Sequence, residues 1–133
     1  MTRIIIESPY AGDVEQNIDY ARACVRDSLK RGEAPIASHL LFTQPGILDD
    51  TLTEERRLGI NAGLAWLPVA NGHAFYVDRG ISGGMKIAYA CAQEYGTSVM
   101  IRSLHKIFSS EEVSDIIRQL SSSLVDSSST ERL

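Results

Sequence analysis

The stretch "IIIESPYAGD" (residues 4–13) decides the fold, because it leads the chain from a strand through a turn and into a helix. Its three isoleucines are typical of a short buried strand, and the Ser-Pro pair behind them signals a turn. Asp13 can cap the following helix, and Gln16 completes a capping-box pattern three residues further on. A simple connection needs only two or three plain polar residues. The Ser, Pro, Tyr and Gly of this turn therefore make it a candidate binding segment.

Outward from this stretch, apolar strand-like segments alternate with helical patterns. Strands are predicted over residues 3–7, 34–38, 73–78 and 98–104. Helices are predicted over residues 14–31, 53–70, 85–95 and 109–124, where apolar residues recur at three- and four-residue intervals. The segment "HLLFTQPGILDDTL" (39–52) is predicted to be a long loop, and loops of this length tend to be functional or mobile.

This alternation implies a parallel sheet with right-handed crossovers. It predicts an α/β fold, namely a small doubly wound sheet of about four strands that is Rossmann- or flavodoxin-like. In a 2-1-3-4 strand order, the ligand crevice lies at the carboxyl ends of the first and third strands. Those are the two strands that Gly-containing turns follow.

The chain is predicted to form one α/β domain over residues 1–104, a C-terminal helix within 105–124 and a disordered tail over 125–133. The apolar stripe of that helix consists of Val113, Ile116, Ile117, Leu120 and Leu124. An exposed stripe would favour aggregation, so something must cover it. Either the helix folds back over the open face of the sheet, or it pairs with the same helix of a second chain.

Composition argues against several classes of protein. The 133 residues are 44% hydrophobic and 23% charged, with a net charge of −4 and no basic patch, which argues against nucleic acid as a partner. No apolar run approaches 18 residues and no signal peptide is visible, so a cytoplasmic protein without a membrane partner is expected. Cys24 and Cys91 are predicted to be buried free thiols. The histidines at 39, 73 and 105 are too dispersed for a metal site, and no cofactor is expected.

The two Gly-containing turns suit a ligand with phosphate or hydroxyl groups, because free N–H groups of a first helical turn point into such a crevice. Gly12 permits close backbone approach, and Tyr10 offers a flat face on which a base or sugar can stack. Ser82 can cap the third helix or donate to a ligand oxygen. Close packing of helices and strands is the alternative reason for these glycines, and core packing is the alternative for Tyr10.

Three further polar residues are placed near the crevice. Asp78 can accept hydrogen bonds from a ribose diol, and Arg79 has the forked geometry that suits a phosphate. His39 can contact a phosphate or base, although a lone histidine is more often a structural hydrogen bonder. The candidate ligand-binding residues are Ser8, Tyr10, Gly12, His39, Asp78, Arg79, Ser82, Gly83 and Met85.

Four blocks in order, "SPYAGD-x-x-x-N-x-x-x-A", "APIASHLLFTQPGILDD", "EERRLGINAGL" and "DRGISGGM", carry a resemblance over residues 3–104. They resemble a family of small bacterial and phage proteins that is related to the nucleoside 2-deoxyribosyltransferases. The resemblance implies the fold predicted above. It also implies cleavage of an N-glycosidic bond by a carboxylate nucleophile on the helix after the third strand. Transferases of this kind are oligomers, so a homo-oligomer through residues 109–124 is expected.

The correspondence of individual residues is partial. Tyr10 and Gly12 fit the first-turn signature of the transferases, and Asp78 fits the end of the third strand. Lys86 stands where their nucleophilic glutamate belongs, and the preceding helix, "NAGLAWLPVAN", has no supporting acid. An ammonium group can neither attack an anomeric carbon nor balance oxocarbenium charge. The loop acids at 49–50 and the helix-start acids at 54–55 are the alternative carboxylates, although helix-start acids more often serve the helix dipole.

These observations favour a protein that binds a nucleoside- or nucleotide-derived small molecule, such as an ADP-ribose-like or modified nucleotide. Such a protein would sequester or sense a signalling nucleotide. The alternative is an N-glycosidase or deoxyribosyltransferase that uses a displaced carboxylate.

Overall fold

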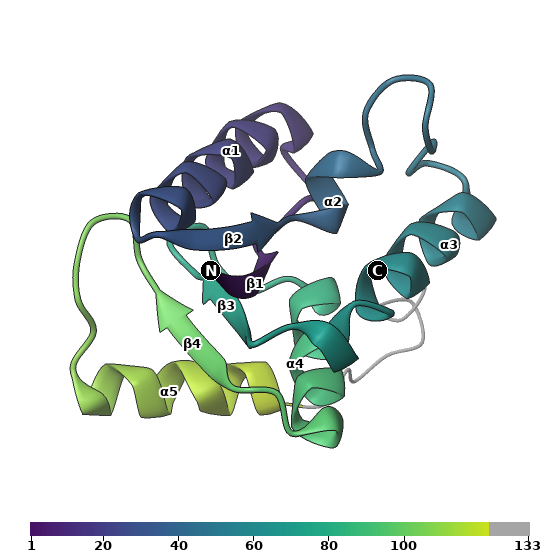
Figure 1. Ribbon diagram of the computed structural model, residues 1–133. Coiled ribbons are helices and arrows are strands. Elements are labelled where there is room, and N and C mark those ends of the chain that lie inside the picture. The colour runs from purple at the N-terminus through teal and green to yellow at the C-terminus, as the bar shows by residue number, and fades with distance from the viewer. Residues whose placement is uncertain (123–133) are drawn as a thin grey trace.

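A four-stranded parallel sheet lies between helices in the computed structural model, which describes residues 1–122 (Figure 1). Its strands are β1 (Thr2–Glu7), β2 (Glu33–Ile36), β3 (Gly72–Tyr76) and β4 (Val99–Arg102). The helices are α1 (Val14–Lys30), α2 (Ser38–Leu41), α3 (Thr53–Leu64), α4 (Gly83–Tyr95) and α5 (Ser110–Ser121), with a short 3-10 helix η1 (Leu67–Val69). The strand order β2-β1-β3-β4 confirms the predicted 2-1-3-4 order and the doubly wound α/β fold.

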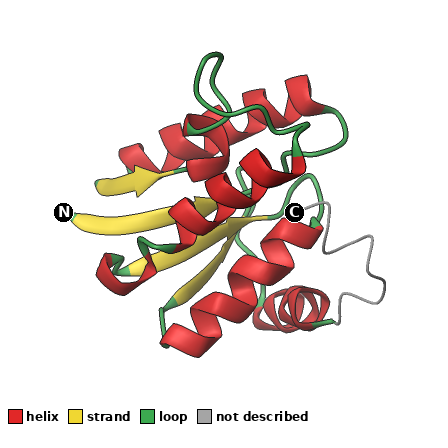
Figure 2. Cartoon of the chain, turned by 90° about the vertical axis from the view of Figure 1, so that its right-hand side faces the viewer, coloured by secondary structure: helices red, strands yellow, loops and turns green. Residues whose placement is uncertain are grey.

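The three isoleucines of β1 supply the core on both faces of the sheet, because successive side chains of a strand alternate. Ile4 and Ile6 pack with Tyr76 of β3 against α1. Ile5 points to the other face, where it packs with Leu67 of η1. Figure 2 shows the resulting layers, with helices on both sides of the strands.

The predicted C-terminal helix is present as α5, and it folds back over its own domain. Ser109 Oγ accepts a hydrogen bond from Glu112 N, and Ser109 N donates to the Glu112 carboxylate, both at 3.1 Å, so the predicted capping box is formed. Leu120 is 2% exposed and packs with Phe75 and Met85. Leu120 of the apolar stripe is therefore covered within its own domain, and pairing of this helix with a second chain stays a prediction. Leu124 and the predicted tail (125–133) lie outside the described residues.

The second strand is shorter than predicted, and the long loop begins with a helix. β2 lies at the edge of the sheet and contains Pro35, which cannot donate to a ladder and is confined to such edges. The ladder stops at Ile36, and Ser38 opens α2. The predicted loop at 39–52 thus starts with a helical turn. β3 and β4 also end two residues before the predicted positions.

The predicted helix at 53–70 consists of two pieces, α3 and η1. Pro68 has no N–H, and in a continuous helix its ring would clash with the carbonyl of Leu64, where α3 ends. α3 packs closely on α2 through Gly63, since a Cβ atom at this position would lie 2.2 Å from Ser38 Oγ. This contact holds α2 and α3 together beside the carboxyl end of the sheet.

Candidate functional site

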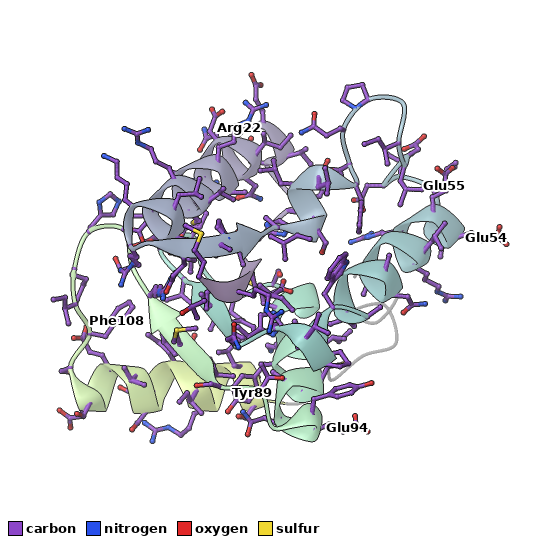
Figure 3. All side chains as sticks on the ribbon, viewed as in Figure 1. Arg22, Glu54, Glu55, Tyr89, Glu94 and Phe108 are labelled. Carbon is purple, nitrogen blue, oxygen red and sulfur yellow. The ribbon has the colours of Figure 1, made fainter. Side chains whose placement is uncertain are left out.

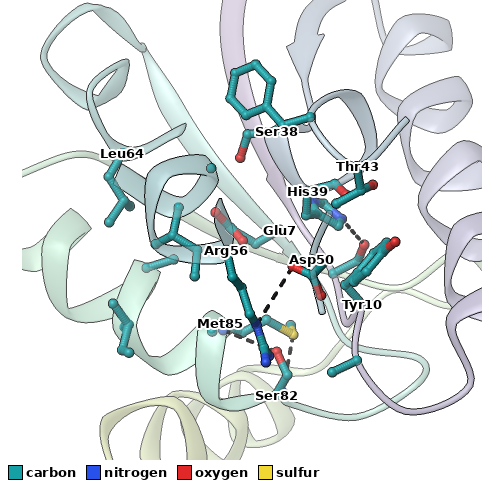
Figure 4. A pocket seen from close by; sticks show the side chains of 18 of the residues that line it. Glu7, Tyr10, Ser38, His39, Thr43, Asp50, Arg56, Leu64, Ser82 and Met85 are labelled. Carbon is teal, nitrogen blue, oxygen red and sulfur yellow. Dashed lines mark hydrogen bonds and ion pairs between the residues drawn. The ribbon is translucent and has the colours of Figure 1, made fainter. Parts of the chain in front are cut away.

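A partly open cavity lies at the carboxyl edge of the sheet, beside the end of β1 (Figure 4). This inner chamber has a volume of about 90 Å³ and is bounded by the end of β1, by α2 and α3, and by the first turns of α4. Its polar lining includes Glu7, Ser8, Tyr10, His39, Asp50, Glu55, Arg56 and Ser82. The chamber therefore lies where the predicted strand order places a ligand crevice.

A wider, open space adjoins the inner chamber. This outer groove has a volume of about 590 Å³ and is lined by Tyr10, Val14, Glu55 and much of the loop after α2. Tyr10, Thr43, Leu48, Asp50 and Glu55 line both spaces. Because they share these residues, the two spaces adjoin, and we treat them as one candidate site with a small inner part and a larger outer part.

The turn after β1 is held in shape by its own helix. Asn17 of α1 is 4% exposed, and its Nδ2 donates to the carbonyl oxygens of Tyr10 (3.1 Å) and Ala11 (3.0 Å). Gly12 has a φ of 99°, which favours glycine. Gly12 lines neither space, so its part in the site is to let the turn present Tyr10.

Ser8 and His39 form a hydrogen-bonded pair in the chamber wall. Ser8 is 4% exposed, and its Oγ lies 2.7 Å from His39 Nε2. Burial lowers the pKa of His39, although the charge of Glu7 opposes this, so the imidazole is neutral at pH 7. His39 Nδ1 is buried and has no partner among residues 1–122. Both predicted residues thus lie in the site, and one ring nitrogen is left for a ligand.

Glu7 is a site residue that the sequence analysis did not find. It ends β1 and lines the chamber, where its Oε1 lies 3.0 Å from Nε2 of the fully buried His73. The register places Ile5 opposite His73, and Glu7 points to the same face of the sheet as Ile5. The sequence did contain a signal for Glu7, because a carboxylate that ends a buried strand lies at the edge of the sheet where ligands bind.

Arg56 is the second residue that the sequence analysis did not find. It projects from α3 into the chamber, and its Nε lies 3.7 Å from Oδ1 of Asp50 (Figure 4). Burial raises the pKa of Asp50, although Arg56 opposes this. Arg56 lies three residues before Gly59, so the two residues share one face of α3, and Gly59 also lines the chamber. The adjacent Arg57 is exposed, and only the position of α3 distinguishes the two arginines.

The turn before α4 contributes Ser82 and Met85 to the chamber. Ser82 caps the helix, because its Oγ accepts from Met85 N at 3.2 Å. Met85 is 1% exposed and is part of the core under the chamber. Gly83 begins α4 and lines neither space.

The structure does not bring Asp78 and Arg79 to the chamber. Asp78 follows Ala74 and Tyr76 on the α1 face of the sheet, where its carboxylate accepts from Tyr20 Oη (2.7 Å), Leu104 N (2.9 Å) and Ser103 Oγ. Burial raises the pKa of Asp78, but these hydrogen bonds lower it more, so the pKa lies below its ordinary value. Its oxygens are therefore already engaged.

Arg79 is engaged in the same region. Its Nε donates to Asn17 Oδ1 at 2.8 Å, and its Nη1 donates to Gln16 Oε1 at 3.2 Å. Asp78, Arg79 and His105 line a separate open depression beside α1. The role predicted for Arg79 at a phosphate is thus not supported by its position.

Other features of residues 1–122 add no site. Within residues 1–122, no group of three or more His, Cys, Asp and Glu side chains is arranged to hold a metal ion. Among the helices that the structure describes, none is both long and apolar enough to cross a membrane. Cys24 is buried and Cys91 half-buried, and both are free thiols.

A family model described as "Domain of unknown function (DUF7768)" matches residues 2–102, which is most of the chain. The chain belongs to this family. No curated protein matches it. Among solved structures, it is similar to a 2-deoxyribosyltransferase from the psychrotolerant bacterium Bacillus psychrosaccharolyticus. That likeness has a TM-score of 0.55 and 17% sequence identity, and it covers 81% of this chain and 77% of the other. At this identity it shows a shared fold.

In this DUF7768 chain, the acidic residues are distributed differently from the expectation based on the transferases. Lys86, which the sequence resemblance aligns with the nucleophile of the transferases, lines an open depression with Asp115 and Arg118 of α5 and does not line the chamber. Glu54 and Glu55 lie at the start of α3 (Figure 3); Glu54 is exposed, whereas Glu55 lines the chamber. The carboxylates of the chamber are therefore those of Glu7, Asp50 and Glu55.

Proposed function

We propose that this protein binds a nucleoside- or nucleotide-derived small molecule across the inner chamber and the outer groove. The observation that carries the proposal is that two adjoining spaces at the carboxyl edge of the sheet share Tyr10. In open α/β sheets, ligands bind outside the carboxyl ends of the strands, at the point where the strand order reverses. Here that point lies between β1 and β3.

The sizes of the two spaces support a ligand that spans both. An engineered cavity of about 150 Å³ holds one benzene molecule, so a chamber of about 90 Å³ accommodates a group smaller than a base. The outer groove, at about 590 Å³, falls within the usual range of ligand pockets. A nucleotide therefore fits with one small polar group inside and its larger part in the groove.

The side chains also suit such a ligand. Tyr10 offers an aromatic face to a base or sugar, and Ser8, His39 and Ser82 offer polar atoms to hydroxyl or phosphate oxygens. An ADP-ribose-like or modified nucleotide has this combination of groups. Because Lys86 stands where the transferases have their nucleophile, we expect the protein to bind such a molecule without cleaving it. A protein that sequesters or senses a signalling nucleotide would behave in this way.

A thermal-shift panel of nucleosides, nucleotides and ADP-ribose tests the proposal. The same mixtures are analysed for free base by chromatography. We expect at least one compound to raise the melting temperature without base release. A panel in which no compound changes the melting temperature would contradict the proposed function.

Cleavage of an N-glycosidic bond is the second candidate, and the carboxylates of the chamber favour it. Glycoside cleavage uses one carboxylate beside the anomeric carbon and one proton donor at the leaving group. Both Glu7 and Asp50 line the chamber. In this candidate reaction, Glu7 takes the first role, and Asp50, whose pKa burial raises, donates a proton to the departing base. Water then supplies the hydroxyl group of the free sugar, and its remaining proton returns to Asp50.

Chromatography of the same mixtures also tests this second candidate. The cleavage candidate predicts that the unmodified protein releases free base. It also predicts that Glu7→Gln loses this activity and that Lys86→Gln retains it. The absence of base release from every compound that binds would exclude it for the panel.

A further inference from the structure

Arg56 presents hydrogen-bond donors that no described residue accepts. Its Nε and Nη2 atoms are buried in the wall of the inner chamber and have no partner within residues 1–122. Its side chain is 16% exposed, so little of the missing hydrogen bonding comes from open solvent. Leaving donors of a charged group buried and unpaired is costly, which makes a ligand acceptor at this position favourable.

Another arginine of the same domain, Arg102, has a guanidinium group whose hydrogen-bond donors are paired. Arg102 donates from Nη1 and Nη2 to the two carboxylate oxygens of Glu33, at 2.8 and 2.6 Å. For Arg56, the acidic neighbour is Asp50, whose Oδ1 lies 3.7 Å from Nε, beyond hydrogen-bond distance. The forked donors of Arg56 are therefore available to a carboxylate or phosphate group.

The other carboxylates of the chamber have partners. Glu7 Oε1 lies 3.0 Å from His73 Nε2, and Glu55 Oε1 accepts from Asp49 N at 3.0 Å. Asp50 is thus the group with which an incoming anion competes for Arg56. The volume of about 90 Å³ admits one phosphoryl group but excludes a complete nucleotide.

We infer that Arg56 binds the phosphoryl oxygens of a nucleoside monophosphate inside the inner chamber, with the nucleoside in the outer groove. This inference rests on the proposed function and makes it more specific, because it selects phosphorylated nucleosides over neutral ones. It also assigns the phosphate contact to α3 and not to the turn that contains Arg79.

The test uses a matched pair of neighbouring arginines in the full chain. Isothermal titration compares the unmodified protein, Arg56→Gln and Arg57→Gln against the four common ribonucleosides and their 5′-monophosphates. A hydrogen bond to a charged group is worth enough that Arg56→Gln should weaken monophosphate binding by about tenfold or more. Nucleoside binding should change little, and Arg57→Gln, at an exposed position, should leave both unchanged.

Two further variants keep the inference testable if Arg56→Gln does not fold. Arg56→Lys retains the charge without the fork and should give an intermediate loss. Asp50→Asn removes the competing carboxylate and should tighten monophosphate binding several-fold. Equal affinity of the unmodified protein for nucleosides and monophosphates, or equal effects of the changes at Arg56 and Arg57, would overturn the inference.

A direct titration with inorganic phosphate separates this inference from the proposed function. If phosphate binds and Arg56→Gln or Arg56→Lys weakens it while no nucleoside or nucleotide binds, the anion site stands and the nucleotide function fails. If nucleosides bind but a phosphate group adds no affinity, the proposed function stands and the role of Arg56 fails.

Discussion

Tyr10 is the side chain that the turn after β1 presents to both the inner chamber and the outer groove. The turn is held by hydrogen bonds from Asn17 to backbone carbonyls, and these do not involve the Tyr10 ring. The position of the ring therefore depends on the backbone of the turn, and its removal leaves that backbone supported. Binding and folding are separable at this residue.

Tyr10→Ala should weaken ligand binding more than it weakens the fold. An aromatic contact contributes about 0.5–1.5 kcal/mol beyond area burial, which corresponds to roughly a two- to twelvefold loss of affinity. Titration of the best ligand from the panel measures the affinity, and urea denaturation measures the free energy of unfolding. A variant that binds normally but loses much of its stability would show that Tyr10 is a packing residue.

His39 should make the stability of the protein depend on pH. Burial lowers its pKa in the folded state below the ordinary value of 6.5, so between these two values the unfolded chain binds a proton that the folded chain does not. The free energy of unfolding therefore falls as the pH drops below about 6.5 toward the folded-state pKa. His39→Gln, which keeps a hydrogen-bonding group beside Ser8 but does not titrate, should flatten this part of the melting temperature profile. Parallel profiles for the two proteins between pH 7 and 5 would rule out this role.

Five of the predicted residues line the chamber, namely Ser8, Tyr10, His39, Ser82 and Met85. Ser8 and Tyr10 belong to the turn directly after a buried strand, where the sequence pattern is most informative. Asp78 lies outside the chamber because the alternation of β3 continues past its end and directs this side chain toward α1 and Tyr20. Arg56 was missed because it lies next to Arg57 in the sequence. Only the contact between α3 and α2 determines which of the two is buried.

At the scale of elements, the chamber depends on how closely α3 approaches α2. Gly63 is buried, and Ser38, which opens α2, occupies the space that a Cβ atom would need. The sequence predicted α3 at Thr53 correctly but not α2, because a single four-residue helix has no apolar periodicity to detect. The packing of α3 on α2 is a tertiary contact, so the local sequence pattern of either helix does not predict it.

Gly63→Ala should destabilise the protein by about 1–3 kcal/mol, because the new methyl group meets Ser38 Oγ at 2.2 Å and Cβ at 2.7 Å. Helix propensity alone predicts the opposite sign, since alanine is favoured over glycine by about 0.5–1 kcal/mol. Urea denaturation measures the change. Asn61→Ala, at an exposed position of the same helix, is the control and should be nearly neutral. A stabilised Gly63→Ala protein would contradict the packing of α2 on α3.

At the scale of the whole molecule, α5 covers part of the sheet that the other helices leave open. Its position beside α4 is visible in Figure 1, and Leu120 joins the core around Phe75. The repeat of apolar residues and the capping box predicted this helix. They did not determine whether its apolar stripe packs on its own sheet or on a second chain. The resemblance to oligomeric transferases favoured a second chain, and the homo-oligomer through residues 109–124 stays a prediction.

Leu120→Ala should cost about 2–5 kcal/mol of the free energy of unfolding, because it removes a buried side chain between α5 and the sheet. Ile107→Ala, at a side chain that is 97% exposed, is the matched control and should change the free energy by less than about 0.5 kcal/mol. Equal, small effects of the two changes would mean that α5 is not docked on its own domain.

The central claim is that a nucleoside- or nucleotide-derived ligand binds where β1 and β3 end. Backbone amide chemical shifts, recorded during titration with the compound that gives the largest thermal shift, test it most directly. The account predicts that the largest changes cluster at residues 8–12, 39–43 and 82–85, around the inner chamber and the outer groove. Changes centred instead on Asp78, Arg79 and His105, beside α1, would contradict it.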